Sequence, residues 1–229
     1  MTEYDTVVFD LDDTLCVSDQ TDEEIHRRVF DRVDAEPFFE LEDMYAVDVA
    51  SLPEADSERR HWRQVYRAVA DRVSADPEPA LLRALADATV EVLDPAAVSF
   101  RPGARAALAD ARERFAVGLL TNGTADRQSR KLERLGIGDA FAATVFCGPG
   151  TGIASKPDPE PFRRVLDALD ARPGTSVYVG DRLDGDVRGA HNAGMASVWV
   201  PTGGAAGDAT PAPEPIHRID TPGDLPSVL

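Results

Sequence analysis

Lysine is scarce in this chain, and its scarcity is a first constraint on function. Of 24 basic residues only Lys131 and Lys156 are lysine, and 41 acidic residues leave a net charge of −17. Such a charge repels nucleic acids and anionic lipids, so neither is an expected partner. Few lysines and many carboxylates are typical of a halophile-like, acidic proteome, although a GC-rich genome would produce the same arginine bias.

Cysteine and long apolar runs are also limited. Cys16 and Cys147 are too few and too far apart in the sequence for a disulfide framework or a zinc site. No stretch approaches the ~20 apolar residues of a membrane span, and the first residues lack the features of a secretion signal. We therefore expect a cytoplasmic protein without a membrane partner, in which both cysteines are small buried side chains.

The strongest local signal lies in the first fifteen residues. An apolar run over residues 6–9 predicts a buried strand, and Asp10 and Asp12 follow where it ends. Carboxylates two positions apart share a face if strand geometry continues, and they repel unless a cation or a proton lies between them. The pattern fits a metal site, an acid/base pair, or simply an acidic solvated turn.

Helices alone are expected between residues 16 and 98. Apolar residues recur at helical spacing over 22–33 and 59–73, and an Ala/Leu-rich segment begins at Pro79 and runs to residue 93. No core strand is predicted there. At 229 residues the chain has room for a domain with an insertion, so we expect a core of residues 1–15 and 99–229 and an all-helical insertion of residues 16–98.

Strands and helices alternate in the remainder of the chain. This alternation predicts an α/β fold, a parallel sheet with helices on both faces. A Gly-, Ala- and Pro-rich segment, 202–215, is expected to be an exposed loop. The expected strands are 116–120, 143–146, 176–179, 196–200 and an edge strand at 216–219, and the expected helices are 102–114, 126–135, 159–169 and 186–193.

Polar side chains follow three of these strands. Asp10, Thr121 and Asp181 each come directly after an apolar run. Because ligands of open α/β sheets bind beyond the carboxyl ends of the strands, we expect these three side chains to lie together. Lys156 stands in a proline-rich loop before a helix, where a lysine is usually a solvated surface charge. Its rarity in so acidic a chain makes a functional role an equal alternative.

Four segments in order resemble the motifs of the haloacid dehalogenase superfamily. They are residues 10–14 (DLDDT), 120–123 (LTNG), 156–157 (KP) and 180–186 (GDRLDGD), and a segment ending in Ala193-Gly194-Met195 follows the last. The helical insertion stands where many members carry a helical cap. The resemblance implies a Rossmann-like core plus a cap domain, and Asp13 stands where the family often has glycine.

The resemblance also implies a mechanism, that of an Mg²⁺-dependent phosphatase. Asp10 would attack phosphorus to form an aspartyl-phosphate, and Asp12 would act as the acid and then the base. Mg²⁺ would be bound by Asp10, the main-chain carbonyl of Asp12, Asp181 and Asp186. The transferred phosphoryl group would be bound by Thr121, the Asn122 amide and Lys156.

Three alternatives share these residues. A 2-haloacid dehalogenase uses the same nucleophile, but such enzymes need no metal and typically lack an acid equivalent to Asp12. A phosphomutase and a non-catalytic phosphate-binding regulator also fit, although intact motifs disfavour the latter. We expect a small phosphorylated metabolite as substrate and a monomer or homodimer. His61, Trp62, Arg63 and Tyr66 of the insertion are candidate substrate contacts, although Trp62 and Tyr66 lie four apart on an apolar stripe, which favours core packing for these two. Arg182 suits a substrate contact and a solvated surface position equally.

Overall fold

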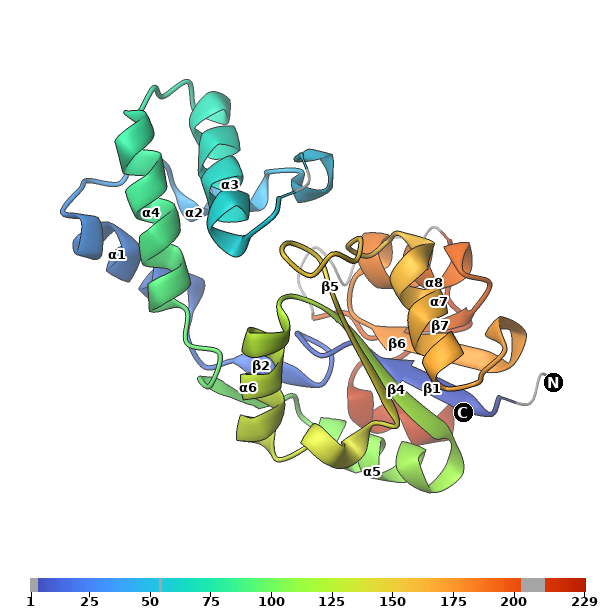
Figure 1. Cartoon of the computed structure of the whole chain (residues 1–229). Coiled ribbons are helices and arrows are strands. Elements are labelled where there is room, and N and C mark those ends of the chain that lie inside the picture. The colour runs from blue at the N-terminus through green and yellow to red at the C-terminus, as the bar shows by residue number, and fades with distance from the viewer. Residues whose placement is uncertain (1–3, 54, 203–212) are drawn as a thin grey trace. The chain divides into compact units, whose positions relative to one another are not determined.

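The computed structural model describes residues 4–53, 55–202 and 213–229. The chain divides into two compact units, one formed by Met1–Ser18 and Val98–Leu229 and the other by Asp19–Ala97. Figure 1 gives the elements of each. Within the described residues, no helix has both the length and the apolar character needed to cross a bilayer.

The larger unit is built on a six-stranded parallel sheet, which confirms the predicted fold class. Its central strand β1 is entirely buried and pairs with β4 on one side and β6 on the other, so that Val8 lies opposite both Gly118 and Tyr178. The strand order is β5 (Ala143–Cys147), β4 (Ala116–Asn122), β1 (Thr6–Phe9), β6 (Ser176–Gly180), β7 (Ala196–Trp199) and β8 (His217–Arg218).

Helices cover both faces of this sheet because successive strand residues point to opposite sides. Val7 belongs to an apolar cluster with residues of α5 (Ala104–Arg114) and α6 (Ala125–Leu135). Its neighbour Val8 belongs to a second cluster with residues of α7 (Pro159–Ala168) and α8 (Arg188–Asn192). A one-turn π-helix, Leu183–Val187, leads into α8, and short 3-10 helices lie at Gly138–Ala140, Pro173–Thr175 and Pro222–Ser227.

A short antiparallel pair corrects the prediction that residues 16–98 contain helices alone. β2 (Cys16–Ser18) pairs with β3 (Val98–Phe100), and both lie in the larger unit. Each strand has only three residues, too few for an alternating pattern to stand out. Their pairing also joins segments about eighty positions apart, which no local signal reports.

The smaller unit is helical. It contains α1 (Asp22–Val33), α2 (Leu41–Tyr45), α3 (Glu58–Arg72) and α4 (Pro79–Val92), with a 3-10 turn at Val49–Ser51. Tyr66 of α3 is only 3% exposed, and its hydroxyl lies 2.7 Å from that of Thr89 in the apolar core of this unit. Trp62 packs against the same core. Of the two interpretations given above, core packing therefore holds for Tyr66.

The end of the chain is described in part. The predicted edge strand is present as β8. Most of the predicted loop at 202–215 lies outside the described residues.

Candidate active site

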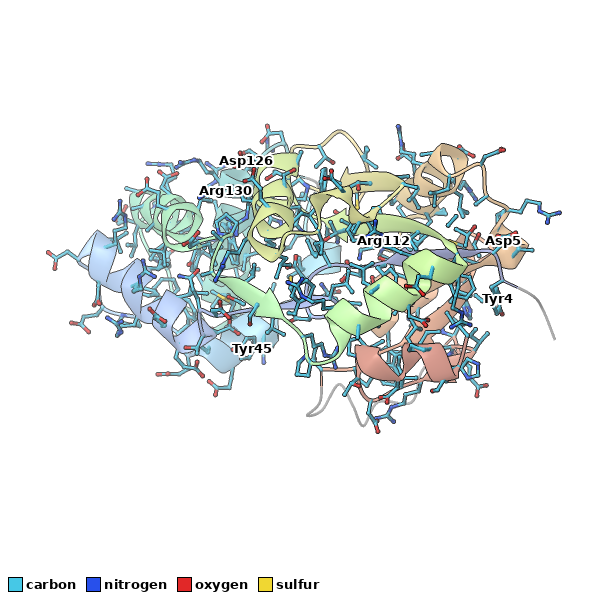
Figure 2. The ribbon with its side chains drawn as sticks, turned by 90° about the horizontal axis from the view of Figure 1, so that it is seen from below. Tyr4, Asp5, Tyr45, Arg112, Asp126 and Arg130 are labelled. Carbon is cyan, nitrogen blue, oxygen red and sulfur yellow. The ribbon has the colours of Figure 1, made fainter. Side chains whose placement is uncertain are left out.

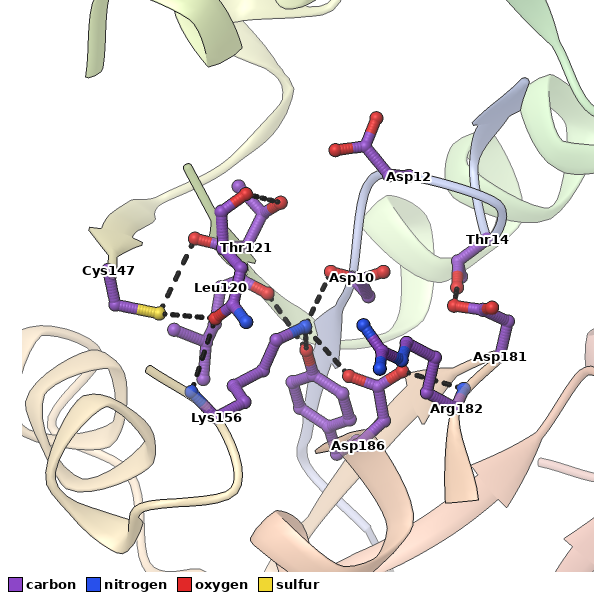
Figure 3. A network of polar contacts seen from close by, with 12 residues as sticks. Asp10, Asp12, Thr14, Leu120, Thr121, Cys147, Lys156, Asp181, Arg182 and Asp186 are labelled. Atoms are coloured by element: carbon purple, nitrogen blue, oxygen red, sulfur yellow. Dashed lines mark hydrogen bonds and ion pairs between the residues drawn. The ribbon is translucent and has the colours of Figure 1, made fainter. Parts of the chain in front are cut away.

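The carboxyl ends of β1, β4 and β6 deliver the predicted polar groups to one edge of the sheet. Asp10 follows β1, Thr121 lies near the end of β4, and Asp181 follows β6 (Figure 3). Asp10 and Thr121 are 5% and 1% exposed, so these polar groups are held inside the protein rather than in a solvated turn. β1 lies between β4 and β6, where the chain crosses over, which is the usual place for a ligand in an open α/β sheet.

Lys156 lies at the centre of the polar cluster at this edge of the sheet. Its side chain is 5% exposed, and Nζ lies 2.6 Å from Asp10 Oδ1 and 2.7 Å from Asp186 Oδ1. It also donates to the Tyr178 hydroxyl at 2.9 Å, and that hydroxyl donates to the Leu120 carbonyl. The three ammonium protons thus meet three acceptors, as Figure 3 shows.

Burial and like charge raise the pKa of two carboxyl groups here. Burial raises the pKa of Asp10 to about 7, although the charge of Lys156 opposes this shift. Burial, followed by the charges of Asp10 and Asp186, raises the pKa of Asp181 to about 8. Burial lowers the pKa of Lys156, but Asp10 and Asp186 outweigh it and hold this pKa well above the usual value. Three carboxyl groups therefore share one ammonium, which leaves an excess of negative charge.

The same three carboxyl groups fit a metal ion. Asp10, Asp181 and Asp186 each offer an oxygen, and these oxygens lie within 4.8 Å of one another. Carboxylate oxygens suit a hard divalent cation such as Mg²⁺, which would also offset the excess charge. Asp186 is fixed further by the Arg182 amide, which donates to its Oδ2 at 2.9 Å. The expected contribution of Asp12, through its main-chain carbonyl, stays a prediction.

The predicted phosphoryl-binding residues lie beside Lys156. The Asn122 side chain holds the Lys156 loop, because its Oδ1 accepts from the Lys156 amide at 3.2 Å and from the Cys147 thiol at 3.0 Å. Thr121 Oγ1 accepts from the Gln128 side chain at 2.8 Å. Burial raises the pKa of the Cys147 thiol to about 11, which keeps it protonated and unreactive.

The Asp12 carboxylate lies apart from this cluster. Lys131 Nζ contacts its Oδ1 at 2.6 Å, and Gln128 Nε2 donates to its Oδ2 at 2.9 Å. Sequence reasoning missed Lys131, Gln128 and Tyr178. The scarcity of lysine, which favoured Lys156, applied equally to Lys131 and would have found it.

Asp13 has the backbone conformation of a turn residue. Its φ is +57°, a left-handed conformation that glycine adopts freely and that Asp tolerates better than most residues. Asp13 therefore occupies a backbone position that glycine also suits, in line with the resemblance noted above.

Comparisons with known proteins agree with the motifs. The model of the haloacid dehalogenase-like hydrolase family matches residues 4–194. The glyceraldehyde 3-phosphate phosphatase of Methanopyrus kandleri is 35% identical over 97% of this chain and 96% of its own length. The phosphoserine phosphatase of Thermus thermophilus is 42% identical over 56% of this chain, and the match spans about half (49%) of that relative.

A solved structure gives a third comparison. The 2-haloacid dehalogenase of Pseudomonas syringae pv. tomato is similar with a TM-score of 0.66 and 27% identity, over 98% of this chain and 97% of that one. Phosphatases and a dehalogenase are thus both among the similar proteins. The choice between them depends on the chemistry of the site.

Proposed function

This chain belongs to the haloacid dehalogenase-like hydrolase family, and on that premise we propose that it is an Mg²⁺-dependent phosphatase of a small phosphorylated metabolite. One observation carries the proposal. Asp10 and Asp12 are two positions apart but lie in different surroundings: Asp10 shares Lys156 with Asp186, whereas Asp12 pairs with Lys131. Two carboxyl groups in separate surroundings suit two separate roles.

The first half-reaction belongs to Asp10. Its carboxylate attacks phosphorus and forms an aspartyl-phosphate, while the bond to the ester oxygen breaks and Asp12 gives that oxygen a proton. Asp12 then takes a proton from water, whose oxygen attacks the phosphoryl group and releases phosphate and the free Asp10. The acid of the first half-reaction is thus regenerated by the second.

Phosphoryl transfer depends on positioning and on neutralising negative charge. Lys156, Thr121 and the Asn122 amide would bind the transferred phosphoryl oxygens. Mg²⁺ bound by Asp10, Asp181, Asp186 and the Asp12 main-chain carbonyl would neutralise the phosphoryl charge. In a chain of net charge −17, an anionic substrate needs such local positive charge in order to approach.

The substrate class rests on the named relatives. The full-length relative is a glyceraldehyde 3-phosphate phosphatase and another is a phosphoserine phosphatase. Both names refer to small phosphomonoesters, and we assign this chain the class rather than either compound. A reducing cytoplasm suits the two free, buried thiols, Cys16 and Cys147.

The dehalogenase alternative is less favoured by the site. Its chemistry attacks carbon and requires no cation, so the carboxylates of Asp10, Asp181 and Asp186 would have only the Lys156 ammonium beside them. The grouping of these three oxygens within 4.8 Å supports the metal-dependent reaction instead.

A substrate panel at high salt tests the proposal. Hydrolysis of 4-nitrophenyl phosphate and of at least one phosphorylated metabolite should require Mg²⁺, stop in chelator and vanish in Asp10→Asn. Asp184→Asn is the matched control, because Asp184 lies in the same motif but is 77% exposed and pairs with Arg188. Halide release from 2-chloropropionate in the presence of chelator would overturn the phosphatase assignment.

A further inference from the structure

Two residues of α6 hold the Asp12 carboxylate from one side. Gln128 and Lys131 are three positions apart and therefore lie on the same face of the helix. Each contacts a different carboxylate oxygen: Lys131 Nζ contacts Oδ1 at 2.6 Å and Gln128 Nε2 contacts Oδ2 at 2.9 Å. Lys131 is 13% exposed and Gln128 is 1% exposed, so both donors are largely buried.

The orientation of the Gln128 amide is fixed by its neighbours. Nε2 lies 2.9 Å from Asp12 Oδ2, 2.7 Å from the Asn122 carbonyl and 2.8 Å from Thr121 Oγ1. A carboxylate and a carbonyl only accept hydrogen bonds, so the donor end of the amide must face them. Gly123 makes room for this contact, since a Cβ there would lie 3.1 Å from Gln128 Cδ.

Burial alone does not hold the Asp12 side chain in place, so its position depends on such contacts. Its side chain is 42% exposed, whereas that of Asp10 is 7% exposed. An exposed carboxylate samples several rotamers, and proton transfer requires it within hydrogen-bond reach of the reacting oxygen. In the ionised and in the protonated carboxyl group, each oxygen keeps a lone pair, so both contacts can persist in either form.

We propose that Gln128 and Lys131 are positioning residues, which fix Asp12 for proton transfer to the leaving oxygen. In this role they act through Asp12 rather than by contact with the substrate, and Gln128 also contacts Thr121 Oγ1 and the Asn122 carbonyl. The proposal rests on the phosphatase function given above. It adds that each lysine pairs with a different catalytic carboxylate: Lys156 with Asp10 and Lys131 with Asp12.

Dependence on the leaving group separates positioning from a general structural role. A nitrophenolate leaves without a proton, whereas an alkoxide needs one from Asp12. In Lys131→Met, kcat/KM for an alkyl phosphate should fall on the order of 10- to 100-fold, the usual effect of misplacing an acid. The value for 4-nitrophenyl phosphate should stay within about 3-fold, and Lys131→Arg should restore much of the loss.

The control variants give each outcome a meaning. Arg130→Met removes a charge from the exposed neighbour of Lys131 on α6 (Figure 2), and it should leave kcat/KM unchanged for both substrates. In an Asp12→Ala background, Lys131→Met should have no further effect, because residues that act as one unit are not additive. Equal losses on both substrates, or a further loss in that background, would overturn the positioning role.

Failure of the underlying function gives a different result. If Asp12→Ala lowers kcat/KM equally for both substrates, the acid role of Asp12 is wrong, whatever Lys131 does. If Lys131→Met does not fold, Gln128→Leu provides the same comparison, judged by the ratio of the two kcat/KM values. A ratio equal to that of the unmodified protein would overturn the proposal.

Discussion

The metal-free protein should lose stability as the pH rises, which is unusual for a protein rich in carboxylates. Burial raises the pKa of Asp10 from 3.8 to about 7. Between these values the unfolded chain has released the proton and the folded chain has kept it. Because the folded state then binds more protons, the free energy of unfolding decreases with pH over this window. A shift of ~3 units at ~1.4 kcal/mol each gives about 4 kcal/mol for Asp10 alone.

Urea unfolding in chelator at pH 4.5 and 7.5 measures this loss. Trp62→Phe leaves the fully buried Trp199 as the fluorescent probe of the larger unit. High salt screens the repulsion between surface charges but not that within the buried site. Asp10→Asn cannot ionise, so between pH 4.5 and 7.5 its stability should fall by about 3 kcal/mol less, because this interval begins above the pKa of the unfolded carboxyl. Asp184→Asn should behave as the unmodified protein does. Identical pH dependence in Asp10→Asn and the unmodified protein would refute the reasoning.

Three further predictions concern neighbouring groups. Gly180→Ala should weaken Mg²⁺ binding in calorimetry, because a Cβ there would lie 2.4 Å from Asp186 Cγ and displace that carboxylate; unchanged affinity would contradict the metal assignment. Lys156→Met should lower the free energy of unfolding in chelator by about 3–5 kcal/mol, the usual cost of leaving a buried charge unpaired, and a loss below about 1 kcal/mol would count against it. Cys16 and Cys147 should resist iodoacetamide at pH 8 until urea is added, since burial raises the pKa of both thiols; rapid labelling of the folded protein would show that they are accessible.

Much of the core fold could be predicted because its signals are local. β1 is buried at all four positions, and three of them, Val7, Val8 and Phe9, are apolar, so it appears in the sequence as one continuous run. The end of that run marks the position of Asp10, and the same logic located Thr121 and Asp181. Parallel strands then bring their carboxyl ends to one edge without any further information.

Gln128 could not be predicted in the same way. A glutamine on a helix is usually exposed, and nothing in its neighbours distinguishes it. Its burial depends on the turn at Gly123 and on the distance between α6 and Asp12, which are tertiary facts. β2 and β3 were not predicted for a related reason: each three-residue segment is a strand only because it pairs with the other, which is distant in the sequence.

Both lysines pair with aspartates of the site, and the contacts of Lys156 show how a lysine differs there from an arginine. Arginine ion pairs of this chain, such as those of Arg27 with Asp31 and Arg114 with Asp110, join exposed side chains one helical turn apart. Lys156 instead directs three donors to three separate acceptors in a buried space. A compact ammonium on a flexible stem can do this, whereas the planar fork of arginine is built for two parallel acceptors. At the position of Lys156, a point charge therefore fits between buried oxygens that the arginine fork does not match.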